Sequence, residues 1–168
     1  MDVFTVRRVT RNHVGDFRYV RLEALRLYPE AFGASFADES QKPDEFFAER
    51  LLLNTVFGGF DLHNRLQDII GISFSTAPKL SHVATFWGMY VRAELRGSGL
   101  SRALLAAALQ AVGTVRTVKL SVVSTNRPAQ ALYRSVGFKE WATDTAALCV
   151  DGVFHDELLM RLDFAPAP

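Results

Sequence analysis

A glycine-rich turn between two apolar segments constrains the fold of this chain more than any other feature. Residues 82–91 are rich in the aromatic and β-branched residues that strands favour. Residues 100–111 carry leucine and alanine at helical spacing, and Gly113 ends that pattern. The sequence between them is Arg96-Gly97-Ser98-Gly99-Leu100-Ser101. The pattern predicts a strand, a tight turn and a helix in succession.

The composition of the turn suits it to binding phosphate. Free backbone N–H groups and the positive end of the helix dipole attract anions at the start of a helix. Arg96 adds a cationic side chain beside them. Glycine is also the default residue of tight turns, so the turn alone does not distinguish a phosphate site from a plain connector.

Two common phosphate-binding motifs are excluded by the sequence. A P-loop requires Gly-Lys followed by Ser or Thr, and the chain contains no such triplet. A dinucleotide fingerprint requires a third glycine and an acidic residue at the end of the next strand. Arg102 occupies the third position, and the next strand ends in the sequence Val123-Ser124-Thr125-Asn126. The turn therefore predicts neither a nucleoside triphosphate nor a dinucleotide as ligand.

A second motif follows the next strand and carries a family resemblance. Asn126 precedes a short helical segment that contains Tyr133 and ends at Gly137-Phe138. Together with the glycine turn, this segment resembles the GNAT superfamily of acetyl-CoA-dependent N-acetyltransferases. The family's turn reads Arg/Gln-x-x-Gly-x-Gly/Ala, and the chain departs from it only at Ser101. A serine there is small enough for a pyrophosphate to approach, and its hydroxyl can donate to a phosphate oxygen.

The resemblance covers residues 82–162, about half of the chain, and includes the last hairpin with its turn at Asp151-Gly152. It implies a single mixed α/β (α+β) domain over residues 1–164 and a frayed tail at 165–168. The expected sheet is mostly antiparallel, with about seven strands that splay between the fourth and the fifth, flanked by about four helices. We expect helices at 13–27, 43–53, 100–111 and 127–136, and strands at 4–9, 56–62, 69–74, 82–91, 117–123 and twice within 138–164.

The resemblance also implies acetyl-CoA as the acyl donor. Backbone groups at the end of the fourth strand would pair with the amides of the pantetheine arm. A backbone N–H of Met89 or Tyr90 would stabilise the oxyanion formed at the thioester. The residues that the resemblance assigns to the donor are Met89, Tyr90, Val91, Arg96, Gly97, Ser98, Gly99, Leu100, Ser101, Asn126 and Tyr133.

Tyr133 and Asn126 each have a structural and a functional interpretation. By spacing alone, Tyr133 is a core aromatic on a helix face, whereas the family match makes it the general acid that protonates the CoA thiolate. Asn126 is either the N-cap of its helix or a hydrogen-bond partner of the donor near the thiol. The two roles of Asn126 are compatible.

The general base is not identified by the sequence. Glu23 is favoured by analogy, because the first helix usually borders the acceptor site in this family. An exposed helix carboxylate flanked by Arg21 and Arg26 is the alternative interpretation. Further candidates are His82, His155, Asp156 and Glu157. The acceptor is also open, although Tyr28, Phe32 and Phe36 would form an apolar wall beside it or cap the core.

The leading hypothesis is transfer of acetyl from acetyl-CoA to a primary amine, of a small molecule or a polypeptide, in a ternary complex. The alternatives are a non-catalytic acyl-CoA sensor or scaffold, and an acyltransferase with another acyl donor or an O-acceptor.

Composition narrows the expected partners. A net charge of +1 gives no nucleic-acid footprint, and no apolar run reaches the roughly 20 residues of a membrane span. A single cysteine, Cys149, excludes a multi-cysteine metal site and is expected as a small buried apolar residue. We expect no metal and, in the absence of a visible signal sequence, a cytoplasmic location. The apolar closing strands leave a homodimer open as a further interpretation.

Overall fold

The computed structural model describes residues 4–165, so residues 166–168 of the expected tail lie outside the described part. Short 3-10 turns connect several elements, namely η1 (Arg11–His13), η2 (Pro29–Ala31), η3 (Pro78–Leu80) and η4 (Ala93–Leu95). The strands and α-helices are, in order, β1 (Thr5–Val9), α1 (Val14–Leu27), α2 (Phe36–Glu39), α3 (Asp44–Leu53), β2 (Thr55–Phe60), β3 (Leu66–Phe74), β4 (Val83–Val91), α4 (Leu100–Ala111), β5 (Thr117–Val123), α5 (Arg127–Ser135), β6 (Lys139–Val150) and β7 (Val153–Asp163).

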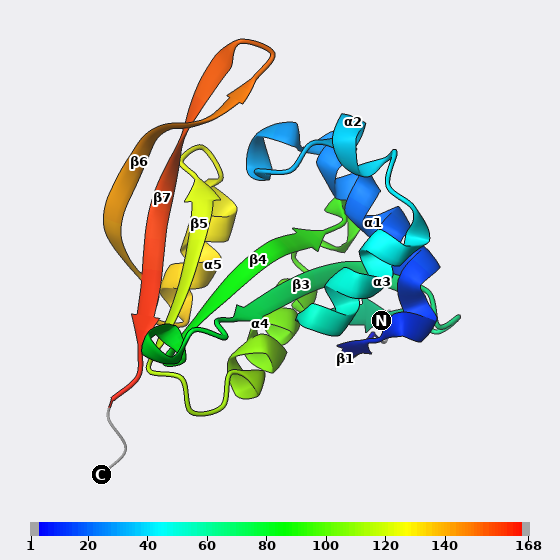
Figure 1. Ribbon diagram of the computed structural model, residues 1–168, viewed down its shortest axis with the longest axis horizontal. Helices are drawn as coiled ribbons and strands as arrows, with labels where there is room; N and C mark the ends of the chain where they lie inside the picture. The colour runs from blue at the N-terminus through cyan, green and yellow to red at the C-terminus, as the bar shows by residue number, and fades with distance from the viewer. Residues whose placement is uncertain (1–3, 166–168) are drawn as a thin grey trace.

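The strands form one seven-stranded sheet in the order β1-β2-β3-β4-β5-β7-β6 (Figure 1). Every neighbouring pair is antiparallel except β4 and β5, which run parallel. The predicted fold class is therefore confirmed. The four predicted helices are present as α1, α3, α4 and α5. The sequence did not predict the short α2, in which Ser35 caps the first turn by accepting a hydrogen bond from the Asp38 N–H at 3.1 Å.

The two central strands separate along their length. β4 and β5 pair only where Val83–Thr85 faces Thr117–Lys119. Beyond these residues, 86–91 and 120–123 continue without pairing to each other, and Figure 1 shows the two strands diverging. This confirms the predicted splay. It leaves backbone hydrogen-bonding groups on two facing strand edges, where a ligand can bind between them.

A β-bulge lies in β4 at the splayed end. The register between β3 and β4 shifts between Ile69 and Gly71. As a result, Gly88 and Met89 lie opposite the single residue Ile70. Gly88 has a φ of +63°, a conformation that residues with a side chain rarely adopt. Because a bulge leaves ladder groups unpaired, backbone N–H and C=O groups are available at this position.

Apolar side chains form two cores, one on each face of the sheet. On one face, α4 and α5 contribute Leu104 and Tyr133 to a core that also contains Ile70. On the other face, α1 and α3 contribute residues such as Phe17 to a core that contains Ile69. Adjacent residues of β3 thus point to opposite cores, as the alternation of a strand requires. Strand β4 therefore lies between two layers of packed apolar side chains, one on each face of the sheet.

The β6–β7 hairpin extends beyond the rest of the sheet (Figure 1). Its turn, Asp151-Gly152, has φ values of +49° and +80°, as a two-residue hairpin turn requires. Cys149 lies next to this turn and is exposed, so the prediction that it is buried was wrong. The reason is its position, because β6 is the edge strand of the sheet and Cys149 lies near the end of the hairpin.

Candidate active site

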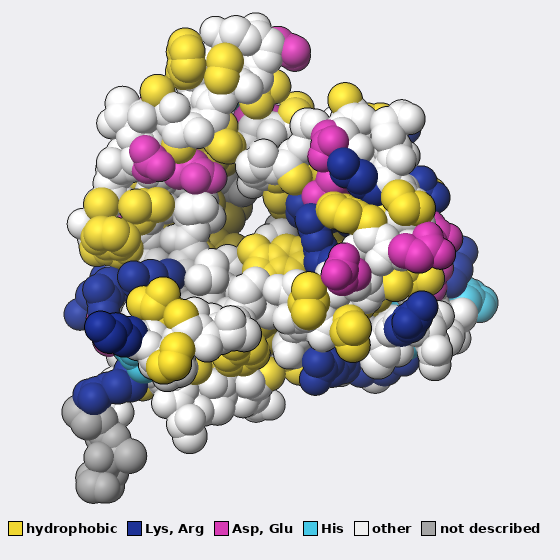
Figure 2. Space-filling view, in the orientation of Figure 1, with side chains coloured by type: hydrophobic (Ala, Val, Ile, Leu, Met, Phe, Trp, Pro, Cys, Tyr) yellow, Lys and Arg dark blue, Asp and Glu magenta, His cyan; other side chains and the backbone are white. Residues whose placement is uncertain are grey.

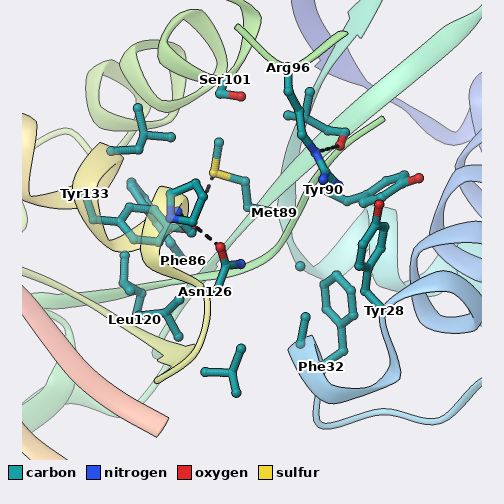
Figure 3. Close-up of a pocket in the computed structure, with 18 of the residues that line it drawn as sticks. Tyr28, Phe32, Phe86, Met89, Tyr90, Arg96, Ser101, Leu120, Asn126 and Tyr133 are labelled. Atoms are coloured by element: carbon teal, nitrogen blue, oxygen red, sulfur yellow. Dashed lines mark hydrogen bonds between the residues drawn. The ribbon is translucent and has the colours of Figure 1, made fainter. Parts of the chain in front are cut away.

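A cavity of about 650 Å³ lies where β4 and β5 diverge. Its walls come from η2, the second half of β4, the glycine turn with the start of α4, the end of β5 and the start of α5. Figure 2 shows the surface hollowed between the β6–β7 hairpin and the helical side, and Figure 3 shows the interior. Apolar side chains and a few polar groups share its walls, which suits a long ligand with both kinds of surface.

The glycine turn has the conformation predicted for an anion site. Gly97 and Gly99 line the cavity with φ values of +80° and +91°, which glycine adopts without strain. Gly99 is the N-cap of α4 and has no side chain to cover the first N–H groups of that helix. Because α4 is a helix of 12 residues, its dipole adds a positive potential at this end. The N–H groups of Gly97 and Gly99 donate to no acceptor within residues 4–165, so they are available to phosphate oxygens.

Arg96 is held at the edge of the cavity by two contacts. Its Nε donates to the carbonyl oxygen of Val91 at 3.1 Å, and its guanidinium lies 4.9 Å from the centre of the Tyr28 ring. Figure 3 shows it beside Tyr28 and Tyr90. These contacts orient the side chain and leave the rest of its N–H groups for an anion.

The other residues of the turn differ in what they present to the cavity. Ser101 lines it, so the departure from the family pattern places a hydroxyl beside the helix start. The Ser98 hydroxyl instead donates to the Leu95 carbonyl at 2.7 Å, and the Leu100 side chain is buried. Neither the Ser98 nor the Leu100 side chain is part of the cavity wall. A ligand contact by these two residues would come from their backbone.

Tyr133 points into the cavity from α5 toward Met89 (Figure 3). Its hydroxyl lies 3.5 Å from the Met89 sulfur, which is a weak acceptor. Burial raises the pKa of the Tyr133 phenol to about 12, because ionisation would place a charge in an apolar environment. The hydroxyl is therefore protonated at neutral pH and has no strong partner within residues 4–165.

Asn126 performs the capping role that was one of its two predicted interpretations. Its Oδ1 accepts a hydrogen bond from the Ala129 N–H at 3.2 Å, which caps α5. Asn126 also lines the cavity. Capping uses only the oxygen, so the amide N–H groups remain available to a ligand. The cap therefore holds a hydrogen-bond donor at the cavity wall.

The three predicted β4 residues, Met89, Tyr90 and Val91, all line the cavity. Met89 belongs to the bulge. The Tyr90 side chain leaves the cavity side and packs in the second core, where its hydroxyl meets Glu23. The backbone of residues 89–91 and the Met89 side chain are therefore the parts of this strand that face the cavity at the splay.

Glu23 is engaged by other residues. One of its carboxylate oxygens accepts hydrogen bonds from the Tyr90 hydroxyl at 2.9 Å and from Arg92 Nε at 2.8 Å. Burial alone would raise its pKa, but hydrogen bonds from Arg92 and Tyr90 outweigh burial and lower it. Glu23 is neither the exposed carboxylate of the alternative interpretation nor part of the cavity lining.

Glu30 is an acidic residue of the cavity wall that the sequence did not single out as a base. It lies on η2 and is the one carboxylate among the lining residues of the described chain. The other predicted bases, His82, His155, Asp156 and Glu157, are absent from that lining. The signal that could have found Glu30 is its place in the loop between the first two helices, beside the aromatic residues expected at the acceptor site.

The structure gives no sign of a metal centre or a membrane span in the part it describes. Among residues 4–165, no three His, Cys, Asp or Glu side chains gather closely enough to hold a metal ion. None of the helices formed by these residues has both the length and the apolar character of a membrane-spanning segment.

Solved structures with the same fold come from several bacteria. The GNAT-family acetyltransferase from Streptococcus pneumoniae superposes with a TM-score of 0.83 at 18% identity, covering 96% of this chain and 100% of that one. A GCN5-related N-acetyltransferase from Kribbella flavida gives 0.78 at 20% identity, covering 96% and 98%. Ribosomal-protein-alanine N-acetyltransferase from Brucella melitensis gives 0.79 at 18% identity, covering 95% and 99%. At these sequence identities, the similarity to the three solved structures is a similarity of fold only.

A comparison with curated proteins finds no match. The sequence model of the acetyltransferase (GNAT) family matches residues 19–138, which include the glycine turn, the bulge and the Asn126–Phe138 segment. The match covers more than half of the chain, and the splayed sheet agrees with it. The chain belongs to the GNAT family of acetyltransferases.

Proposed function

We propose that the protein transfers an acetyl group from acetyl-CoA to a primary amine by direct attack in a ternary complex. The observation that carries this proposal is that the glycine turn, the β4 bulge, Asn126 and Tyr133 all line one cavity. The transfer needs an anion site for the donor's phosphates, backbone partners for its amides and a proton donor near its sulfur. Family membership supports acetyl transfer as the reaction.

The donor would lie along the splay with its pyrophosphate at the start of α4. There it would meet the N–H groups of Gly97 and Gly99, the Ser101 hydroxyl and the Arg96 guanidinium. The pantetheine arm carries amides, which would pair with the backbone of residues 89–91 as an additional strand. This placement brings the thioester to the end of the cavity that Tyr133 and Met89 share.

The chemical step would begin with attack of a neutral amine nitrogen on the thioester carbonyl carbon. Negative charge develops on the carbonyl oxygen, and a backbone N–H of the bulge at Met89 or Tyr90 would stabilise it. The C–S bond then breaks, and the thiolate takes a proton from the Tyr133 hydroxyl. The attacking nitrogen loses its second proton as the amide forms, and a proton returns through solvent to the Tyr133 oxygen. The burial that raises the pKa of this phenol would also make a thiolate in the same cavity more basic.

The amine must lose a proton before it attacks, because an alkylammonium group titrates near pH ~10. We assign this task to Glu30, directly or through a water molecule, because it is the one acidic residue among those of the described chain that line the cavity. For Glu23, which analogy favoured, we propose a positioning role. Its bonds to Tyr90 and Arg92 fix the end of β4 beside the donor site.

Tyr133→Phe tests the general acid. The hydroxyl is removed and the ring, which packs in the core, is kept, so the affinity for CoA should stay nearly unchanged. Turnover should fall about 10²- to 10⁴-fold. The assay is release of free thiol from acetyl-CoA with a panel of amines and peptides, and Tyr19→Phe, at an exposed site on α1, is the control. Unchanged turnover in Tyr133→Phe would remove the assignment.

The same assay separates the enzyme from a binding module. Tight CoA binding with no thiol release across a broad panel of amines and alcohols would favour an acyl-CoA sensor or scaffold. Release with longer acyl donors or only with alcohols would instead indicate another acyltransferase. The buried phenol favours the enzyme, because a module that only binds the donor has no use for a proton donor near the sulfur.

A further inference from the structure

A second, smaller cavity adjoins the first on the α1 and α3 side of the sheet. It has a volume of about 260 Å³. Trp87 of β4 lines both cavities, so the indole is a wall that they share. Figure 2 shows Lys and Arg side chains along the helical side of the central hollow. The lining residues of this second cavity are Arg21, Arg50, Asn54, Ser73 and Trp87.

Two arginines in this cavity share one carboxylate. Arg21 is only 5% exposed, and its Nε and Nη2 donate to both oxygens of Glu39 at 3.0 and 3.1 Å. Arg50 Nη1 donates to the same carboxylate at 2.9 Å. Burial would raise the Glu39 pKa, but the two guanidinium groups lower it below the ordinary value. The cluster therefore carries two positive charges and one negative charge.

The positive charge in excess is directed toward the bulge. Arg21 Nη1 makes no hydrogen bond to any residue of 4–165, and it lies 3.3 Å from the position that a Cβ on Gly88 would occupy. None of the five lining residues is acidic. Glu39 neutralises only one of the two guanidinium charges, so one positive charge remains in excess and the cavity is complementary to an anion.

The second polar group of this cavity that lacks a hydrogen-bond partner is also a hydrogen-bond donor. Trp87 Nε1 is buried and has no acceptor among the described residues. Asn54 and Ser73 are already satisfied, because the Ser73 hydroxyl donates to Asn54 Oδ1 at 2.6 Å and Asn54 Nδ2 donates to the Arg50 carbonyl at 2.9 Å. The cavity thus offers the Trp87 indole N–H and Arg21 Nη1, neither of which donates to an acceptor within the described residues.

We propose that this second cavity binds a carboxylate of the acceptor, so that the acceptor is an amino acid or another primary amine carrying a carboxylate. The proposal rests on the proposed function of the main cavity. One net positive charge matches a single carboxylate better than a doubly charged phosphate. Trp87 precedes the bulge residue Gly88 in β4, so a carboxylate beside Trp87 leaves the amine of the same molecule facing the donor site.

A binding experiment tests the cavity without turnover. The chain has two tryptophans, and Trp141 lies on the hairpin and is 53% exposed. In a Trp141→Phe variant, Trp87 is the only tryptophan, and because it lines both cavities, CoA is bound before the titration begins. With CoA bound, titration with L-amino acids should change this fluorescence saturably, whereas the corresponding α-amides should bind at least tenfold more weakly.

Arg50→Gln in the Trp141→Phe background should abolish the preference for the carboxylate. Arg50 is chosen because Arg21 still holds Glu39 when Arg50 is replaced. Arg8→Gln is the matched control, since Arg8 is exposed on β1 and lines neither cavity. In the thiol-release assay, kcat/KM for amino acids should exceed that for their amides about ten- to hundredfold, and Arg50→Gln should bring the ratio close to one.

The two assays separate this proposal from the function it rests on. Carboxylate-selective fluorescence changes without thiol release would support the cavity and contradict the proposed transfer to amines. Thiol release with amides as good as with amino acids, and no saturable change with carboxylates, would overturn the carboxylate site and leave the transfer intact. An unchanged preference in Arg50→Gln would also overturn it.

Discussion

Glu30 and Glu23 show how neighbours decide the chemistry of a carboxylate. Glu23 is held by Arg92 and Tyr90, and its lowered pKa makes it a weaker base than a free glutamate. Glu30 lies in the cavity wall, and no hydrogen bond or ion pair within residues 4–165 occupies its carboxylate. A base must lie in the cavity that holds the amine, and this position is why we propose Glu30 and not Glu23.

Glu30→Gln should lower kcat/KM for the amine about a hundredfold at pH 7. The defect should shrink toward pH 10, because the amine then loses its proton without a base. Tyr133 stays protonated over this range, since its pKa is about 12. The measurement is the pH profile of thiol release, with Glu45→Gln on exposed α3 surface as control. An equal loss at every pH would point to a binding role for Glu30 instead.

Asp68 presents a different case, in which burial dominates. It is fully buried on β3. Its Oδ1 accepts a hydrogen bond from the Gly59 N–H, and its Oδ2 has no partner within the described chain. Burial raises the pKa of this carboxyl to about 7, although the Gly59 bond and the charge of Arg92 oppose the shift. The folded protein therefore binds a proton at Asp68 more tightly than the unfolded chain does.

This difference predicts a pH-dependent stability. The contribution of Asp68 is fully present below pH 4 and is lost as the pH rises from about 4 to 7, where the folded carboxyl ionises. Each pKa unit is about 1.4 kcal/mol, so the loss is at most about 4 kcal/mol. Asp68→Asn keeps an acceptor for Gly59 and cannot ionise, so it should be more stable than the native chain at pH 8.

Urea unfolding of both proteins from pH 4.5 to 8.5 measures this effect. The difference in unfolding free energy between Asp68→Asn and the native chain isolates Asp68, because the other titrating groups cancel in it. It should rise with pH and level off above pH 7. A difference that does not change with pH would mean that Asp68 has an ordinary pKa.

At the scale of elements, the β4 bulge is the part of the sheet whose backbone N–H we propose as the oxyanion donor. Gly88→Ala should strain the backbone at a φ of +63° and bring a methyl group within 3.3 Å of Arg21 Nη1. We expect a destabilisation of about 1–2 kcal/mol and a fall in kcat larger than the change in KM for acetyl-CoA, because the oxyanion donor moves. Gly33→Ala, with open space and an ordinary backbone, is the control. Unchanged kcat would separate the bulge from catalysis.

Elements with local signals could be predicted from the sequence to within about one residue. Helix α5 begins after the Asn126 cap and ends before Gly137, as its cap residues indicate. Helix α2 was missed because four residues form a single turn, which has no hydrophobic period. The hairpin turn was found, but the exposure of Cys149 depends on which strand forms the edge of the sheet.

The residues of the second cavity could not be predicted as a group, because packing between distant segments brings them together. Arg21 looks like a solvated helix residue, yet its partner Glu39 lies 18 positions away on α2. Trp87 looks like an ordinary strand aromatic, and its place follows from Gly71, where any Cβ would collide with the indole ring. A sequence motif records neither pairing, whereas the glycine turn and the Asn126–Phe138 segment are short and continuous.

For the whole molecule, the splay divides the sheet into two parts that share one hydrophobic core. Strands β1–β4 carry α1, α3 and α4, and strands β5–β7 carry α5. Within the described sheet, three residue pairs form the ladder between β4 and β5, and the core that contains Ile70, Leu104 and Tyr133 packs across both parts. Acetyl-CoA in the cavity would contact both, because the lining includes β4 and the glycine turn on one side and β5 and α5 on the other. The donor would then act as a structural link.

Binding of acetyl-CoA should therefore stabilise the whole domain. At about 100 times Kd, mass action gives about 2.7 kcal/mol, which corresponds to a rise in Tm of about 5–10 °C for a chain of this size. S-acetyl-pantetheine, which lacks the pyrophosphate, should give a much smaller rise in Tm at equal concentration. Arg96→Ala should reduce the rise that acetyl-CoA gives and leave the rise that S-acetyl-pantetheine gives unchanged.

Calorimetry should show one unfolding transition with the donor bound. Equal shifts with both thioesters would place the phosphates away from the glycine turn, and two separate transitions with saturating acetyl-CoA would mean that the donor does not join the two parts of the sheet.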